Sequence, residues 1–252
     1  MNTLYAFCRV IDDIADSTTL SDQEKRTQLA AWEETIHSKK PAKALQHYQP
    51  LGSELLSNIG KFDINPHIVL TILTGVKSDI GRSCIQDFSE LKEYCYQVAC
   101  AVGLASIRIF GCQESASDDY AEQLGYFLQL TNIIRDVGED IDDNGRVYLP
   151  QSELIAHNYS MDELQNKIEN EQWQQLMLFQ CLRAKSYREK AQSIFEKLSK
   201  KEQNKLLPAE IMASIYEKLL FKVEDSNYSV LSHRHKLSKA QKARIFLQKA
   251  LF

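Results

Sequence analysis

Apolar residues recur every three or four positions through most of this 252-residue chain, which is the spacing of one helix face. In the segment 3–16, one side of such a helix would carry Leu4, Phe7, Cys8, Ile11 and Ala15. The same spacing predicts further helices at about 22–38, 51–62, 68–79, 90–111, 119–142, 169–199 and 206–226. No segment alternates apolar and polar residues as a half-buried strand does. The pattern therefore predicts one all-α domain, a helical bundle, over residues 1–252.

Capping residues and turn formers support these boundaries. N-caps are expected at Ser21 or Asp22, at Asp87 or Ser89, at Asp118 or Asp119, and at Ser160. The stretch "DINPH" breaks one helix from the next, and the Asn-Gly pair in "DDNGR" predicts a loop. The opening "MNTLYAFCRVIDDIAD" starts inside an apolar pattern with no cap before it. We therefore expect that a segment upstream of this chain is missing.

The composition narrows the class of protein. The chain has 9 Gly and 5 Pro, where average usage gives about 18 and about 13, and so few turn formers favour long helices. The net charge of -4 argues against a nucleic-acid-binding protein, which usually carries a basic domain. No apolar stretch approaches the roughly 18 residues of a membrane span, and no signal peptide is visible. The six cysteines form no CxxC pair, so we expect buried thiols in a reducing cytoplasm.

Two acidic stretches, "DDIAD" and "DVGED", interrupt otherwise apolar helices. Asp12 and Asp16 are four positions apart, as are Asp136 and Asp140, so each pair shares one helix face. Like charges at this spacing repel by roughly 0.2–0.5 kcal/mol per pair, so such a pair does not stabilise a hydrophobic core. One interpretation is a pair of solvated helix ends. The other is two faces opposed across the bundle that hold Mg²⁺, which prefers carboxylates, water and substrate phosphates.

Residues beside these stretches suit a diphosphate. Arg9 lies one turn before the first pair, and Arg135 directly precedes the second. Guanidinium groups bind phosphate oxygens in bidentate fashion. Gln129 and Asn132 fall on the same stripe of the helix as the second pair, where amides could coordinate or position water. Buried, hydrogen-bonded amides with a structural role are the alternative.

The stretches "YAFCRVIDDIAD", "YCYQVACAVG" and "QLTNIIRDVGED" followed by "GRVYLP" resemble the squalene/phytoene synthase family. The motifs occur in order across nearly the whole chain. The resemblance implies the isoprenoid synthase fold and a prenyltransferase that joins two prenyl diphosphates head to head. In that family the two aspartate motifs bind the diphosphates through Mg²⁺, for which Mn²⁺ can substitute. The resemblance implies this role for Asp12, Asp16, Asp136 and Asp140.

The resemblance also implies substrate contacts beyond the acidic pairs, at Tyr5, Arg9, Gln129 and Asn132. Tyr94, which opens "YCYQVACAVG", is implied in proton handling near the departing diphosphate, although a tyrosine in a packed helix is more often core. Arg234 aligns with a basic residue that lies near the diphosphate in some members, and would face the site with Tyr216. Lys77 stands where relatives often show an acidic residue, so no site residue is taken from "LTGVKSDIGRS".

Within the family, "VGLASIRIFG" and "SNYSVLSHRHKLSKAQKARI" most resemble bacterial presqualene diphosphate synthases of hopanoid pathways. This implies farnesyl diphosphate as the substrate, a cyclopropyl product and no need of NADPH. Phytoene synthesis from geranylgeranyl diphosphate is the alternative, since the two substrates differ in tail length. A non-catalytic helical homologue is a third reading, because family members normally carry an upstream helix with a Ser-Phe segment, and this chain begins after it.

The C-terminal stretch "HRHKLSKAQKARIFLQK" is basic on one side and carries Leu237, Ile245, Phe246 and Leu247. A basic amphipathic segment can lie on an anionic membrane surface. Peripheral, reversible contact with the inner membrane is therefore one hypothesis for this tail. A final helix packed on the bundle with a solvated basic face is the other.

Overall fold

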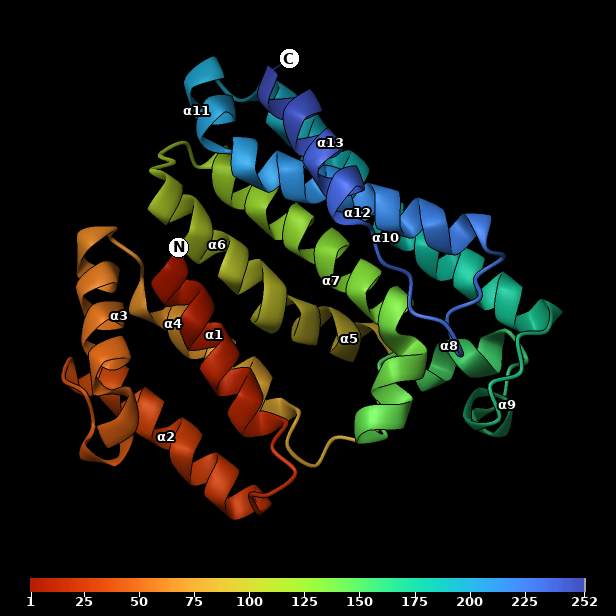
Figure 1. Cartoon of the computed structure of the whole chain (residues 1–252), viewed down its shortest axis with the longest axis horizontal. Helices are drawn as coiled ribbons and strands as arrows, with labels where there is room; N and C mark the ends of the chain where they lie inside the picture. Colours follow the sequence, from red (N-terminus) through yellow and green to blue (C-terminus); the bar gives the residue numbers. More distant parts are fainter. Residues whose placement is uncertain (252) are drawn as a thin grey trace.

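A computed structural model describes residues 1–251 as a bundle of helices (Figure 1). The α-helices are α1 (Asn2–Ala15), α2 (Asp22–Ser38), α3 (Gln49–Lys61), α4 (Pro66–Ser78), α5 (Phe88–Cys95), α6 (Ala101–Phe110), α7 (Ala116–Asn144), α8 (Gln151–Ala156), α9 (Met161–Gln165), α10 (Glu171–Lys197), α11 (Lys200–Lys205), α12 (Leu207–Asp225) and α13 (Lys239–Leu251). A 3₁₀ segment, η1 (Lys43–Tyr48), and a π-helical segment, η2 (Tyr96–Cys100), complete the secondary structure. The prediction of a single all-α domain is confirmed.

Side-chain caps begin several helices where the sequence predicts them. The Ser21 hydroxyl accepts from the Glu24 N–H at 3.3 Å, and the Glu24 carboxylate accepts from the Ser21 N–H at 2.8 Å. Ser160 forms the same reciprocal cap on α9. Asp87 caps α5 by accepting from the Glu90 N–H at 3.0 Å. These hydrogen bonds satisfy backbone N–H groups that the first turn of a helix leaves without partners. Because the bonds are local, the sequence alone locates the helix starts.

Helix α7 begins at Ala116, before the predicted caps, because a distant carboxylate holds its first turn. Glu202 of α11 accepts from the Gln113 N–H at 3.0 Å and from the Ser117 hydroxyl at 2.9 Å. Burial alone would raise the pKa of Glu202, but these bonds and one from Lys205 outweigh it and lower the pKa to about 2. The start of α7 is therefore set by a tertiary contact.

The predicted helix over 90–111 is interrupted by the π-helical segment η2, which separates α5 from α6. A Cβ atom on Gly125 of α7 would lie 2.6 Å from the Cys100 Cα and 2.8 Å from its nitrogen. Helix α7 thus packs against η2 backbone to backbone. The wider turn breaks the 3.6-residue register between α5 and α6, which the sequence pattern treats as one helix.

Two hydrophobic clusters form the core. One is built by α1–α4 around Phe7 and Trp32, and the other by α5, α7–α10 and α12 around Phe127 and Trp173. Helix α6 belongs to both, because Ala101 and Ala105 pack into the first cluster and Ile107 into the second. Figure 1 shows α6 and α7 between the two halves, with the last turns of α1 and α7 at the same end of the molecule.

The cysteines are free thiols. The prediction that all six are buried is confirmed for Cys95, Cys100, Cys112 and Cys181, whereas Cys8 and Cys84 are only partly buried. No helix within residues 1–251 combines the length and the apolar character that crossing a bilayer requires.

Candidate active site

The first acidic pair lies at the end of α1, with Asp12 in its last turn and Asp16 as its C-cap. Asp12 is half-buried, and burial followed by the charge of Asp16 raises the pKa of the Asp12 carboxyl to about 7. Asp16 is exposed and accepts a hydrogen bond from Arg146 at 2.7 Å. The pair is therefore a crowded set of oxygens that a cation would stabilise.

The second acidic pair lies near the end of α7. Asp136 accepts from Arg135 Nε at 2.7 Å, and Arg234 Nε lies 2.9 Å from the same Oδ1 atom. Arg234 also pairs with Glu139. Burial followed by the charge of Asp136 raises the pKa of Asp140 to about 7. This pair is likewise a half-buried anionic site with two guanidinium groups beside it.

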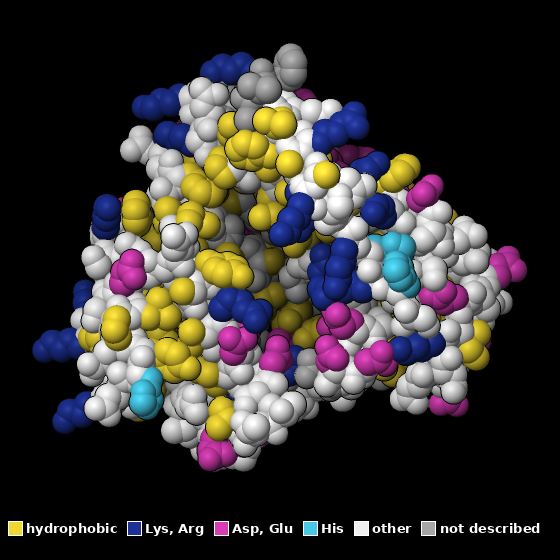
Figure 2. Space-filling view, viewed as in Figure 1, with side chains coloured by type: hydrophobic (Ala, Val, Ile, Leu, Met, Phe, Trp, Pro, Cys, Tyr) yellow, Lys and Arg dark blue, Asp and Glu magenta, His cyan; other side chains and the backbone are white. Residues whose placement is uncertain are grey.

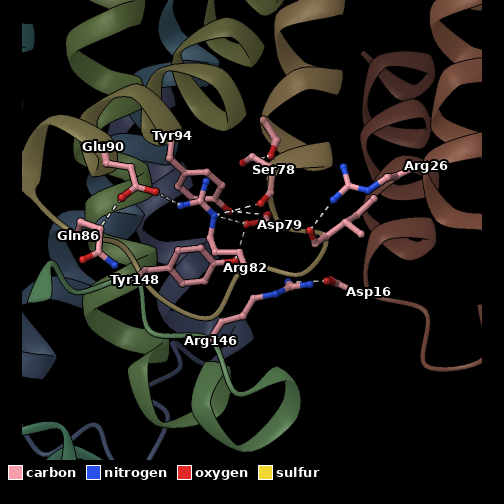
Figure 3. A network of polar contacts seen from close by, with 12 residues as sticks. Asp16, Arg26, Ser78, Asp79, Arg82, Gln86, Glu90, Tyr94, Arg146 and Tyr148 are labelled. Carbon is pink, nitrogen blue, oxygen red and sulfur yellow. Dashed lines mark hydrogen bonds and ion pairs between the residues drawn. The ribbon is translucent and has the colours of Figure 1, made fainter. Parts of the chain in front are cut away.

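Arg146, in the turn after α7, joins the two pairs. Its Nη1 donates to Asp16 of α1, and Figure 3 shows the side chain reaching across to that carboxylate. Burial raises the pKa values of Asp79 and Asp140. The positive charge of Arg146 opposes this in both residues, and for Asp79 it is the largest of the influences that lower the pKa. The charge of this one guanidinium thus influences carboxylates at the ends of α1, α4 and α7, and it bonds directly to Asp16.

Asp79, at the end of α4, is the centre of the polar network in Figure 3. Its two oxygens accept from the Tyr94 hydroxyl at 2.9 Å and from the Tyr148 hydroxyl at 3.1 Å. The two rings stack with centroids 5.1 Å apart, and Arg82 lies over the Tyr94 ring. Burial and then Asp79 raise the pKa of Tyr94 well above its ordinary value, so Tyr94 is a protonated donor. Tyr94 therefore belongs to a polar network centred on Asp79.

Tyr94 is the residue of this network that the sequence predicts. Asp79 is not predicted, because Lys77, two residues before it, stands where relatives often show an acidic residue and no site residue is taken from the end of α4. Lys77 pairs with Glu33 at 2.6 Å. Arg146 and Tyr148 both lie in "GRVYLP", a stretch that already carried the family resemblance. That motif was the signal that could have identified them.

An apolar cavity of about 470 Å³ lies between α6, α7 and α12. Its lining includes Val102, Phe110, Leu124, Leu128, Gln129 and Asn132. Gln129 and Asn132 are one turn apart on α7, and the Asn132 Oδ1 atom is buried without a hydrogen-bond partner. Figure 2 shows a central hollow walled by hydrophobic side chains, with acidic side chains on both sides at its lower end.

A second hollow of about 470 Å³ adjoins this cavity and shares Met212 and Tyr216 with it. Four cationic side chains line the second hollow, namely Arg135, Arg234, Lys236 and Lys242. Two of the four already contact Asp136. The structure thus places Arg135, Arg234 and Tyr216 together, between an apolar cavity and an acidic stretch.

Two residues implied as substrate contacts, Tyr5 and Arg9, lie on the exposed surface of α1. The Tyr5 side chain is exposed. Arg9 pairs with Asp13 at 3.1 Å on the exposed side of α1, and not with the acidic pair itself. Burial is the largest influence on the pKa of Asp12 and raises it, whereas the charge of Arg9 lowers it. Arg9 therefore lies near the site without contacting it.

The donor set fits Mg²⁺ held jointly by protein and substrate. Among residues 1–251, no group of three or more His, Cys, Asp or Glu side chains is arranged to hold an ion. Mg²⁺ commonly takes one or two carboxylates together with substrate phosphates. Each acidic pair offers such oxygens, and the unpaired Asn132 Oδ1 is a further hard donor one turn before Asp136. A dication would also favour the charged forms of Asp12 and Asp140.

The family model described as squalene/phytoene synthase matches residues 1–241. This chain belongs to the squalene/phytoene synthase family. It is therefore a prenyltransferase of the kind that condenses prenyl diphosphates head to head. Its curated relatives include the phytoene synthase of Arthrospira platensis, 31% identical over 92% of this chain and 76% of the relative. The presqualene diphosphate synthase of Zymomonas mobilis subsp. mobilis is 34% identical over 64% of this chain and 54% of the relative.

Solved structures agree with the isoprenoid synthase fold. A dehydrosqualene synthase in complex with ligand superposes with a TM-score of 0.78 at 26% identity, covering 99% of this chain and 84% of that one. The squalene synthase HpnC from Alicyclobacillus acidocaldarius superposes with a TM-score of 0.77 at 20% identity, over 90% and 82% of the two chains. The resemblance stated from the sequence is confirmed.

Proposed function

We propose that this prenyltransferase joins two molecules of farnesyl diphosphate head to head, giving presqualene diphosphate, inorganic diphosphate and a proton. The observations that carry the proposal are the Arg146 bond to Asp16, which links the turn after α7 to the end of α1, and an apolar cavity that reaches Asn132, one turn before Asp136. Charged groups suit the diphosphates, and the cavity suits their isoprenoid tails. The condensation is redox-neutral, so it needs no NADPH.

Asp12, Asp16, Asp136 and Asp140 hold Mg²⁺ in this proposal. When bound, Mg²⁺ would neutralise the negative charge of the leaving diphosphate. The protein's own contribution is to carry one carboxylate pair at the end of α1 and the other near the end of α7, with Arg146 linking these two ends. Mn²⁺ offers the same hard-cation chemistry.

Arg135, Arg234 and Tyr216 contact the diphosphate from the basic hollow, because guanidinium forks match phosphate oxygens. Gln129 and Asn132 orient it where the apolar cavity meets the second acidic stretch. Tyr5 and Arg9, on the exposed side of α1, would have to turn inward to join these contacts.

Tyr94 Oη holds the proton that it shares with Asp79, and we assign this pair to proton handling beside the departing diphosphate. The raised pKa of Tyr94, caused by burial and then by Asp79, keeps the hydroxyl protonated until a base develops nearby. The apolar walls around Leu124 and Leu128 exclude water from the reacting carbons, so that a carbocation is not hydrolysed.

Phytoene formation from geranylgeranyl diphosphate is the second candidate. It is favoured by the relatives named phytoene synthase, which align with 92% or 95% of this chain, whereas the relative named presqualene diphosphate synthase aligns with 64%. The two activities share the acidic pairs and differ in tail length.

Incubation with C15 and C20 diphosphates separately, with Mg²⁺, and mass spectrometry of the products tests the proposal. A C30 cyclopropyl diphosphate from the C15 substrate supports it, and a C40 product from the C20 substrate supports phytoene synthesis instead. The absence of any diphosphate release from either substrate identifies a non-catalytic homologue.

Peripheral membrane contact by α13 is a further part of the proposal. This helix carries exposed Phe246 and Leu247 together with the cations Lys242 and Arg244. Lys242 also lines the basic hollow, so the helix adjoins the site. Leu237 is buried in the bundle and cannot take part in a membrane surface. A protein docked this way could exchange lipid substrates without carrying their tails through water.

A further inference from the structure

Gly138 lies in the second acidic stretch, two residues after Asp136, where a C-terminal segment crosses α7. A Cβ atom on Gly138 would lie 2.1 Å from the Leu231 carbonyl oxygen and 2.8 Å from that of Val230. Non-bonded carbon and oxygen atoms do not approach this closely. Any side chain at position 138 would therefore push the crossing segment, residues 229–237, away from α7.

The crossing segment cannot move aside freely, because other contacts fix it. The Leu231 N–H donates to Glu169 at 2.9 Å, and the other Glu169 oxygen accepts from the Ser229 hydroxyl at 2.8 Å. Just before the segment, the Tyr228 carbonyl accepts from Trp173 Nε1 at 2.9 Å. The segment is thus held by α10 and its flank while it lies directly on the backbone of α7.

The same segment carries Arg234 to the acidic stretch. Arg234 Nε lies 2.9 Å from Asp136 Oδ1, and the guanidinium also pairs with Glu139. These carboxylates stand on the two sides of Gly138 in the sequence. We infer that Gly138 is a positioning residue for Arg234, because its missing side chain lets the crossing segment rest on α7. The inference rests on the proposed function, in which Arg234 contacts the substrate diphosphate.

Hydrogen–deuterium exchange of the intact protein tests the positioning directly. Gly138→Ala should speed exchange of the amides in residues 229–237. Gly60→Ala is the matched control, because a Cβ there meets nothing within 4 Å, and it should leave this exchange unchanged. Unchanged exchange of the crossing segment in Gly138→Ala overturns the inference.

Calorimetric binding of inorganic pyrophosphate in the presence of Mg²⁺ tests the consequence. Gly138→Ala and Arg234→Met should each raise the Kd about tenfold, the loss of one charge-assisted contact. The double variant should bind no more weakly than either single one, since both changes remove the same contact. The inference is overturned if the increases in Kd multiply in the double variant, or if Gly138→Ala binds pyrophosphate as tightly as the wild type does.

Glu169→Ala removes both oxygens that hold the crossing segment on its other side, and serves if Gly138→Ala does not fold. It should also speed exchange in residues 229–237 and weaken pyrophosphate binding, with no further loss in an Arg234→Met background. Wild-type binding by Glu169→Ala overturns the inference in that case. Failure of the proposed function is distinguishable, because the wild type would then form no condensation product while exchange still responds to Gly138→Ala.

Discussion

The Arg146 guanidinium donates to the Asp16 carboxylate at 2.7 Å, although 130 residues separate the two in the chain. This bond ties the turn after α7 to the end of α1, and so connects the two acidic stretches. Arg146→Met should weaken binding of pyrophosphate with Mg²⁺ by about tenfold, because the carboxylates lose their shared cation and repel. Calorimetry measures the change. Arg108→Met is the control, since Arg108 makes a comparable 2.6 Å pair with Asp118 elsewhere, and an equal effect there would contradict the prediction.

Asp136→Ala should lower turnover by about 10²-fold or more while the helix content stays unchanged. Asp136 belongs to the acidic site and contributes little to the core, so α7 does not depend on it. Product formation and circular dichroism measure the two quantities. Asp142→Ala, on the same helix, removes an exposed carboxylate paired with Lys167 and should keep activity. Full activity of Asp136→Ala would exclude the metal role.

Tyr94→Phe should lower kcat by about 10²-fold with little change in KM, because it removes only the hydroxyl that donates to Asp79. Tyr126→Phe is the matched control, since Tyr126 is also buried but packs against Tyr187 in the core. Steady-state kinetics with the substrate identified by mass spectrometry gives both constants. Wild-type turnover in Tyr94→Phe would leave Tyr94 with a packing role alone.

Glu202→Gln should destabilise the fold by about 1–3 kcal/mol at pH 7, because the buried carboxylate accepts bonds at the start of α7. Burial opposes the charge, but bonds from Lys205, Gln113 and Ser117 lower the pKa of Glu202 from 4.5 to about 2. Because the pKa of Glu202 is lower in the folded than in the unfolded state, its ionised carboxylate stabilises the fold above about pH 4.5. This stabilisation is lost as the pH falls toward 2. Urea unfolding at several pH values should therefore show the two proteins converging in acid. A constant difference would refute this assignment.

Sedimentation with anionic liposomes should pellet the protein at low salt and less of it at high salt. Charge attraction by exposed Lys242 and Arg244 is screened within about 8–10 Å at physiological salt. Phe246→Glu should abolish pelleting, whereas Ile155→Glu, an exposed apolar position on α8, should not. No pelleting of the wild type at low salt would leave α13 as an ordinary packed helix.

Local rules in the sequence determined the all-α fold, most helix ends and the placement of each acidic pair on one face. The 3.6-residue period puts Asp136 and Asp140 side by side whatever the rest of the chain does. Capping is equally local, so Ser21, Asp87 and Ser160 were identified correctly. The motifs also identified the family, because their residues and their order can be read from the sequence without knowing how the helices pack.

Tertiary structure alone decided which groups meet. Asp79 accepts from Tyr94 across a break between helices, and Arg146 reaches Asp16 across the molecule. The π-helical segment and the early start of α7 likewise depend on neighbours, Gly125 on η2 and a carboxylate of α11. No periodicity encodes such contacts, because they depend on how close two backbones come after packing. At Gly138 that distance, set by the crossing segment, decides where a distant arginine lies.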